Sequence, residues 1–168
     1  NGGKTLTIKL RKDAKWSNGD PVTAHDFEYA WKRVVNPDTA SEYAYIMYDL
    51  KNAKAINMGK KDVDELGVKA VDDHTLKVEL TKPIPYINEM FAFGTFMQLN
   101  EKVVKKNGDQ YGTTAAKTVF NGPFKVKEWK VEDKIQLVKN EDYWDKKQVH
   151  LDRVNYKVLK DQQAGASL

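Results

Sequence analysis

The segment from Leu10 to Trp31 constrains the fold more than any other part of this chain, because it combines signals for a strand end, a turn and a capped helix. Leading into this segment, Leu6, Ile8 and Leu10 alternate with polar residues, which is the pattern of a strand with one buried face. The run Ser17–Pro21 then brings together Asn, Gly, Asp and Pro, the residues that favour tight turns. We therefore predict a strand that ends near residue 10 and is followed by a turn.

A helix is predicted directly after this turn. Thr23 is followed three residues later by Asp26, a variant of the capping box, in which side-chain oxygens accept hydrogen bonds from otherwise unpaired N–H groups. After this cap, apolar residues recur at helical spacing, at Phe27, Ala30, Trp31, Val34 and Val35. Pro37 then ends the predicted helix. Because these residues share one stripe, we expect Trp31 to pack in a core.

Further elements are predicted along the first hundred residues. A second helix would be capped by Asp38 or Ser41. It would offer apolar contacts through Tyr45, Tyr48 and the Ile46/Leu50 pair. Residues 51–65 are polar, and we expect a loop at Gly59–Asp62. The alternating segments around Asp72–Thr75 predict a β-hairpin. Pro85 favours the first turn of a short helix through Phe91, and Asn100–Glu101 starts another helix that Asn107–Gly108 ends.

The last third of the chain is predicted to form strands. Residues 113–118 are small and polar and indicate a loop, whereas 120–129 and 134–138 alternate as a strand pair that would place Trp129 in a core. Val154, Tyr156 and Val158 predict a final strand. Because strands and helices mix without a strict βαβ repeat, we expect an α/β fold with a mixed α+β sheet and helices.

Composition excludes several classes of function. The 168 residues are 40% hydrophobic, and the 28 Lys and Arg residues are interspersed with 24 Asp and Glu residues, which favours a solvated surface over a nucleic-acid patch. No apolar run approaches the ~20 residues that cross a bilayer, and the first residues given do not show the charged start and apolar stretch that are typical of a signal peptide. The chain has no cysteine, which removes disulfide and thiolate chemistry.

No arrangement of residues points to catalysis or to a metal. His25, His74 and His150 are scattered, and the Asp72–His74 run is better explained as a hairpin turn than as an acid and base pair. The acidic residues at 62, 64 and 65 lack the spacing of a calcium loop. No nucleophile elbow, P-loop or dinucleotide motif occurs, so we expect no enzyme activity and no cofactor.

The chain resembles the solute-binding proteins of peptide ABC importers, the oligopeptide- and dipeptide-binding family (solute-binding protein family 5). The resemblance begins in the Leu10–Trp31 segment. Further markers follow in the family's order, and they are Pro37-Asp-Thr-Ala-Ser41 with Tyr43, Leu66 to Leu76, Pro83-Ile-Pro-Tyr86, Asn121-Gly-Pro-Phe124 and Tyr143-Trp144. Together they span residues 4 to about 159.

This resemblance implies a position within a larger fold. Proteins of the family are type II periplasmic-binding-protein-like clamshells, in which two lobes close on a ligand, and this chain resembles an internal part of the first lobe. Residues 1–100 would form a small α/β subdomain of that lobe. Residues 101–168 would be a partial segment of its main subdomain, and the boundary would lie near Leu99–Asn100.

The resemblance also implies a function and two site residues. Tyr43 and Phe93 occupy places that line the peptide pocket in the family, although this chain has Glu42 where a proline is common. The parent protein would capture short extracellular peptides and deliver them to the membrane subunits of an ABC permease. Nickel complexes, haem or oligosaccharides remain alternative ligands, as does a role as a pheromone receptor or adhesin. The resemblance implies that the membrane would be reached only through a lipid anchor outside this chain. The excess of lysine favours a Gram-positive cell-surface lipoprotein over a free periplasmic protein.

Overall fold

The computed structural model describes residues 2–159, which divide between two compact units. Among the described residues, the first unit comprises 2–12 and 23–101, and the second comprises 13–22 and 102–159. Residues 160–168, the end of the expected second segment, lie outside the described residues. The chain therefore leaves the first unit at residues 13–22, returns to it at residue 23, and leaves it again after residue 101.

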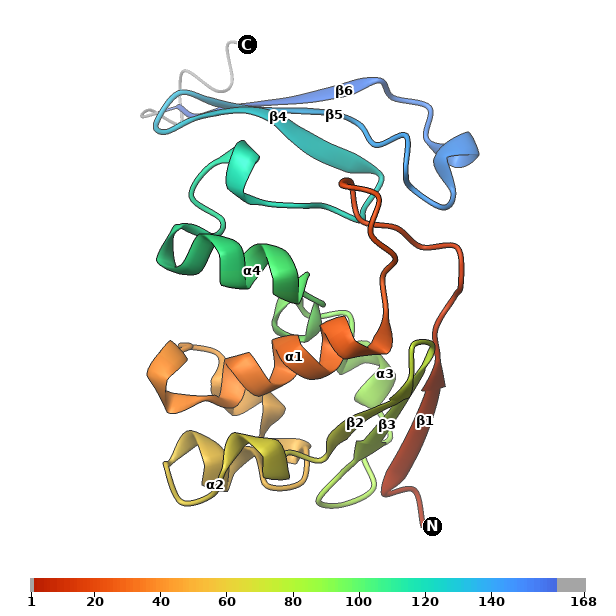
Figure 1. The fold of residues 1–168 in the computed structure, drawn as a ribbon, viewed down its shortest axis with the longest axis vertical. Helices are drawn as coiled ribbons and strands as arrows, with labels where there is room; N and C mark the ends of the chain where they lie inside the picture. The colour runs from red at the N-terminus through yellow and green to blue at the C-terminus, as the bar shows by residue number, and fades with distance from the viewer. Residues whose placement is uncertain (1, 160–168) are drawn as a thin grey trace. The chain divides into compact units, whose positions relative to one another are not determined.

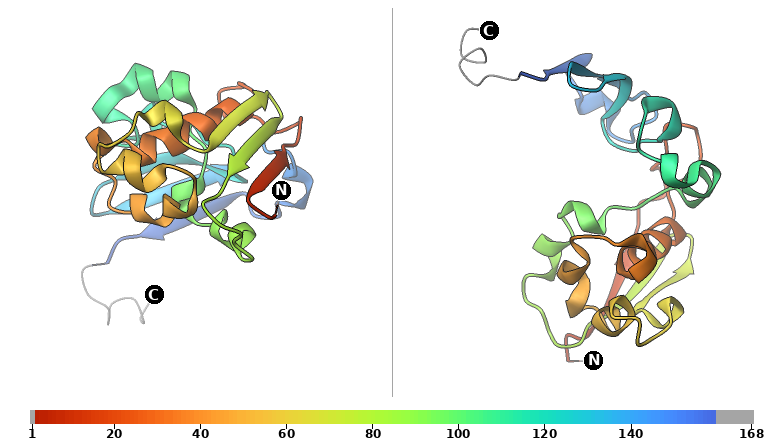
Figure 2. Two further views of the ribbon diagram at one scale, coloured as in Figure 1. Left: turned by 90° about the horizontal axis from the view of Figure 1, so that it is seen from below. Right: turned by 90° about the vertical axis from the view of Figure 1, so that its left-hand side faces the viewer.

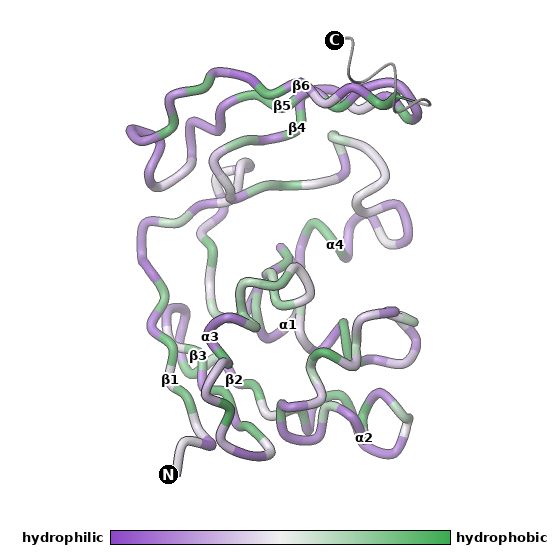
Figure 3. The backbone as a smooth tube through the Cα atoms, turned by 180° about the vertical axis from the view of Figure 1, so that it is seen from behind, coloured by the Kyte–Doolittle hydropathy of each residue, from purple (hydrophilic) through white to green (hydrophobic). Residues whose placement is uncertain are grey.

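The first unit is built on a three-stranded antiparallel sheet with the order β1-β3-β2, formed by β1 (Thr5–Lys9), β2 (Val68–Asp72) and β3 (Thr75–Glu79). Hydrophobic and hydrophilic residues alternate along these strands (Figure 3). The register places Leu6 opposite Val78 and Ile8 opposite Leu76. The predicted strand and the predicted hairpin are both confirmed.

Helix α1 (Ala24–Val35) packs beside β2 (Figures 1 and 2). Its start follows the predicted capping box, because the Thr23 N–H donates a hydrogen bond of 2.9 Å to Asp26 Oδ2. Trp31 is 2% exposed, so its predicted core position is confirmed. The core of this unit consists of buried residues from the helices, the sheet and the connecting segments, among them Trp31, Val35, Met47, Leu50, Ile56, Leu76, Val78 and Phe96.

The segment after α1 differs from the prediction in two respects. The predicted second helix is a 3-10 helix, η2 (Ala44–Asp49), and its cap is Tyr43 rather than Asp38 or Ser41. A short helix, α2 (Ala53–Asn57), lies within the polar stretch 51–65, for which no helix was predicted, and it ends before the loop predicted at Gly59–Asp62. Two residues of α2 explain why it forms, since Ala53 and Ile56 are three positions apart and at most 1% exposed. This pair is too short a pattern to identify from sequence.

The remaining helices and 3-10 turns are distributed over both units. Helix α3 (Ile87–Met90) forms where a short helix was predicted, but it begins at Ile87, so Pro85 precedes the helix and does not lie in its first turn. Helix α4 (Glu101–Asn107) begins and ends at the predicted residues. Other 3-10 turns are Pro37–Thr39, Val63–Glu65, Gly94–Phe96, Gly108–Gln110, Ala115–Lys117 and Lys146–Gln148. The 3-10 turn at 115–117 falls inside the segment that was predicted to be an irregular loop.

The second unit contains an antiparallel sheet with the order β4-β5-β6, formed by β4 (Phe124–Lys130), β5 (Lys134–Lys139) and β6 (Arg153–Lys157). All three strands were predicted, although β4 begins later than expected. Residues 13–22 join this unit through Ser17, whose N–H donates to the Phe120 carbonyl at 2.7 Å. Trp129 is 43% exposed, so its predicted core position is wrong: alternation identified the strand but not whether its apolar face is covered.

Candidate functional site

The most distinctive surface feature of the first unit is a cluster of three exposed aromatic rings, Tyr43, Tyr45 and Phe93, which we call the ring cluster. The ring centroids of Tyr43 and Phe93 are 5.9 Å apart, and those of Tyr43 and Tyr45 are 6.2 Å apart. Both distances lie within the range of favourable aromatic pairs, ~4.5–7 Å. The three side chains nevertheless remain 51%, 58% and 45% exposed, so they are available to a ligand.

The 3-10 helix η2 positions the two tyrosines. Residues three apart share one side of a 3-10 helix, and here Ala44 and Met47 are 2% and 0% exposed and anchor η2 in the core. Tyr43 precedes the helix and Tyr45 lies between the two anchors in the sequence, and both side chains remain more than half exposed. Tyr45 was predicted to make apolar contacts from a helix. In the structure its side chain is 58% exposed and its ring contacts the ring of Tyr43.

Phe93 is positioned by the aromatic core beneath it. Its N–H donates to the Met90 carbonyl at 3.0 Å, and its own carbonyl accepts a hydrogen bond from the Phe96 N–H at 2.9 Å. Phe96 is 1% exposed and packs edge-on against Trp31, with a centroid distance of 5.2 Å. The Trp31 Nε1–H also donates to the Phe96 carbonyl at 2.9 Å. The segment that carries Phe93 is therefore attached firmly to α1.

The structure thus brings together the two residues that the resemblance had singled out, Tyr43 and Phe93, although they are far apart in the sequence. Sequence reasoning missed Tyr45 as a member of the cluster. Neither Tyr43 nor Tyr45 has a hydrogen bond to its hydroxyl group from any residue in the described part of the chain. The cluster can therefore offer apolar ring faces together with two hydroxyl groups, which suits an amphipathic ligand such as a peptide.

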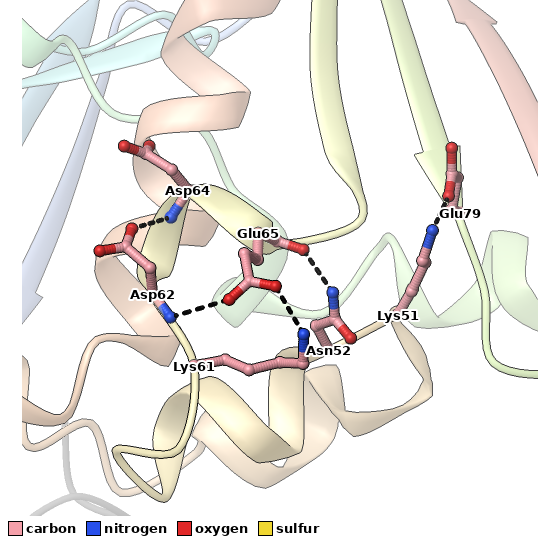
Figure 4. Close-up of polar contacts among 7 residues, drawn as sticks. All are labelled: Lys51, Asn52, Lys61, Asp62, Asp64, Glu65 and Glu79. Atoms are coloured by element: carbon pink, nitrogen blue, oxygen red, sulfur yellow. Dashed lines mark hydrogen bonds and ion pairs between the residues drawn. The ribbon is translucent and has the colours of Figure 1, made fainter.

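The acidic residues at 62–65 serve the local fold (Figure 4). Asp62 Oδ1 accepts a hydrogen bond from the Asp64 N–H at 2.8 Å, and Glu65 Oε2 pairs with Lys61 Nζ at 2.5 Å. The hydrogen bond from Lys61, followed by the one from the Asp62 N–H, lowers the pKa of Glu65 below its usual value. Within residues 2–159, no group of His, Cys, Asp and Glu side chains is arranged to hold a metal ion.

A second candidate is a charged cavity of about 580 Å³ beside α1, lined by residues that include Glu28, Lys32 and Asp64. Lys32 Nζ lies 2.9 Å from Glu28 Oε1 and 2.7 Å from Asp64 Oδ1. Burial raises the pKa of Glu28, but the hydrogen bond from the Ala70 N–H and the ammonium groups of Lys32 and Lys69 outweigh it and lower the pKa overall. Since these charges compensate one another, we interpret the cavity as part of the scaffold.

The histidine and acid pair at the β2–β3 turn also has a structural explanation. The His74 N–H donates to Asp72 Oδ1 at 2.8 Å, which closes the hairpin turn and lowers the pKa of Asp72. His25 Nε2 lies 3.5 Å from Asp73 Oδ1, and both side chains are mostly exposed. These contacts fit a turn, as predicted, better than a catalytic pair.

Among residues 2–159, no helix is both long enough and apolar enough to cross a membrane.

Comparison with known proteins identifies the family. The profile described as bacterial extracellular solute-binding proteins, family 5 Middle, matches residues 1–168. The chain belongs to this family. Oligopeptide-binding protein OppA of Bacillus subtilis is 50% identical to it over 153 residues, covering 91% of this chain and 28% of that protein. The family and this relative are named as binding proteins, and the family description calls its members extracellular.

Solved structures of family 5 proteins share the fold. The substrate-binding domain of an oligopeptide ABC transporter from Bacillus anthracis superposes with a TM-score of 0.96 at 54% identity, covering 99% of this chain and 32% of that one. Listeria monocytogenes OppA bound to peptide gives 0.96 at 49% identity, covering 99% and 33%. The chain thus spans a third or less of the length of these relatives, and its fold is that of part of a periplasmic-binding-protein-like structure.

Proposed function

We propose that this chain is part of the substrate-binding component of an ABC importer that captures extracellular oligopeptides and delivers them to a membrane permease. The observation that carries the proposal is the pairing of Tyr43 with Phe93, both exposed, on a family 5 scaffold. In this proposal the two rings form one wall of the peptide site. A binding role without catalysis is the simplest function for such a surface.

The proposed mechanism is closure of two lobes about a hinge. An extended peptide would bind mainly through its backbone hydrogen bonds, as in strand addition, while hydrated pockets accept its side chains. Closure of the second lobe would bury the peptide and signal to the permease that the site is occupied. Residues 1–100 would act as a small subdomain of the first lobe, and residues 101–168 would belong to its main subdomain.

The proposal is tested with the full-length protein that contains this chain. Calorimetric titration with mixed tri- to pentapeptides should give saturable binding, and Tyr43→Ala and Phe93→Ala should each weaken it. Tyr156→Ala is the matched control, because Tyr156 is 56% exposed and lies in the other unit. Equal affinities for the wild type and both site variants would contradict the assignment. Stabilisation by a nickel complex, haem or an oligosaccharide, but by no peptide, would favour the alternative ligands.

A second measurement concerns the 168-residue chain alone. Because the site would be completed by the second lobe, the isolated chain should bind peptides weakly or not at all. Micromolar binding by the isolated chain would overturn this part of the proposal. We further propose that the protein is held at the surface of a Gram-positive cell by a lipid anchor outside this chain, which membrane fractionation and lipid labelling of the full-length protein would test.

A further inference from the structure

Tyr45 is the most exposed member of the ring cluster, with 58% of its surface accessible. The plane of its ring makes an angle of 34° with the ring plane of Tyr43. The ring plane of Phe93 makes an angle of 57° with that of Tyr43. Tyr43 thus has one aromatic neighbour from η2 and one from the segment after α3. A ligand side chain that contacts Tyr43 can therefore also contact a second ring.

The chemistry of the cluster favours a particular kind of side chain. Aromatic pairs gain interaction energy beyond that of the area they bury, because the edge of one ring is attracted to the face of the next. An aliphatic side chain of similar size gains only the burial. Rigid aromatic rings also lose little conformational entropy when they bind. The cluster should therefore distinguish a phenylalanine side chain from a leucine side chain.

The exposure of Tyr45 argues against a purely structural role. The core anchors of η2 are Ala44 and Met47, which remain in place when the Tyr45 ring is removed. The hydroxyl group of Tyr45 has no partner in the part of the chain that the structure describes, so its loss breaks no internal hydrogen bond there. A substitution of Tyr45 should therefore alter ligand contacts while leaving the fold of the first unit intact.

We propose that Tyr45 is a specificity-determining residue of the peptide site, and that the ring cluster selects peptides that carry an aromatic side chain. This inference rests on the proposed peptide-binding function and adds a preference and a residue to it. Gains of about 0.5–1.5 kcal/mol for aromatic pairs correspond to a preference of about 2- to 12-fold in dissociation constant.

The test compares peptides of equal length in the full-length protein. Dissociation constants are measured by calorimetry for Ala-Ala-Ala, Ala-Leu-Ala and Ala-Phe-Ala. The wild type should bind Ala-Phe-Ala about 2- to 12-fold more tightly than Ala-Leu-Ala. Tyr45→Leu should reduce this ratio toward one, whereas Tyr45→Phe should retain it. Tyr156→Leu, at a similarly exposed tyrosine of the other unit, should leave the ratio unchanged.

Each remaining outcome decides against the proposal. An aromatic preference that survives in Tyr45→Leu would show that Tyr45 does not determine it. A large fall in the melting temperature of the peptide-free Tyr45→Leu variant, with the ratio retained, would show a structural role instead. Binding of all three peptides by the wild type with equal affinity would overturn the inference and leave the proposed function standing. Failure of the wild type to bind any peptide would overturn both.

Discussion

Replacing Trp31 with Phe should destabilise the first unit substantially, because Trp31 joins α1 to the segment that carries Phe93. Its indole is 2% exposed and donates its only N–H to the Phe96 carbonyl at 2.9 Å. It also stacks on Phe91 at a centroid distance of 5.5 Å and meets Phe96 edge-on. The Trp31→Phe variant keeps an aromatic ring in this position but removes the donor and part of the volume.

The size of the effect follows from two contributions. Leaving the Phe96 carbonyl buried without its partner costs about 1–3 kcal/mol. The smaller ring leaves a void of about 40 Å³, which at ~24 cal/mol per Å³ adds about 1 kcal/mol. The free energy of unfolding should therefore fall by about 2–4 kcal/mol, with the lower values applying if neighbouring side chains move into the void.

The assay is urea unfolding followed by far-ultraviolet circular dichroism, which is independent of the indole fluorescence that the substitution removes. The control is Trp129→Phe, which makes the same chemical change at a side chain that is 43% exposed and should cost less than about 0.5 kcal/mol. A loss below 1 kcal/mol for Trp31→Phe, or equal losses for the two variants, would refute the role assigned to the buried hydrogen bond.

Four further predictions concern the scaffold. In Glu28→Gln the free energy of unfolding, measured with urea, should fall by about 1–2 kcal/mol at pH 7. Because the folded-state pKa of Glu28 is lowered, the stability that its carboxylate contributes is present above the unfolded pKa and is lost as pH falls through the folded pKa. At pH 3 the wild type and the variant should therefore differ less in the free energy of unfolding. Gly67→Ala should cost about 1–3 kcal/mol in the same assay, because its Cβ would lie 2.7 Å from a carbonyl oxygen of β3, whereas Gly94→Ala meets no atom within 4 Å. Asp26→Ala should lower the free energy of unfolding by about 1–2 kcal/mol in the same urea assay, since the Thr23 N–H loses its acceptor. Amide hydrogens of β5 should exchange faster than those of β3, because the core cluster lies in the first unit; equal protection would contradict this.

Local patterns predicted those elements whose signals lie within a few residues of each other. The cap at Thr23 and Asp26, the stripe that buries Trp31 and the hairpin around Asp72–Thr75 all follow from neighbouring residues, and all were confirmed. Helix α2 was missed because just two of its residues, Ala53 and Ile56, are buried, and two apolar positions are too short a pattern to identify a helix. The burial of Trp129 was predicted wrongly because alternation gives the two faces of a strand without saying whether a face is covered.

The ring cluster could be predicted only in part, for a physical reason. Tyr43 and Phe93 were named through the resemblance to a family, whereas their contact depends on how η2 and the segment after α3 pack on the same core. Neither segment has a long periodic pattern that would fix its direction. Tyr45 was missed because one tyrosine in a run of three could not be assigned to the surface until the 3-10 geometry of η2 was known.

The arrangement also explains why exposed rings can hold a defined geometry. An exposed aromatic side chain on a mobile loop would lose conformational entropy on binding, which would reduce its contribution to affinity. Here Met47 and Phe96, at most 1% exposed, fix the backbone on either side of the cluster, and Trp31 links Phe96 to α1. The core therefore prepares the surface in advance of the ligand. On this argument, loosening the core at Trp31 should weaken peptide binding even though Trp31 does not belong to the ring cluster.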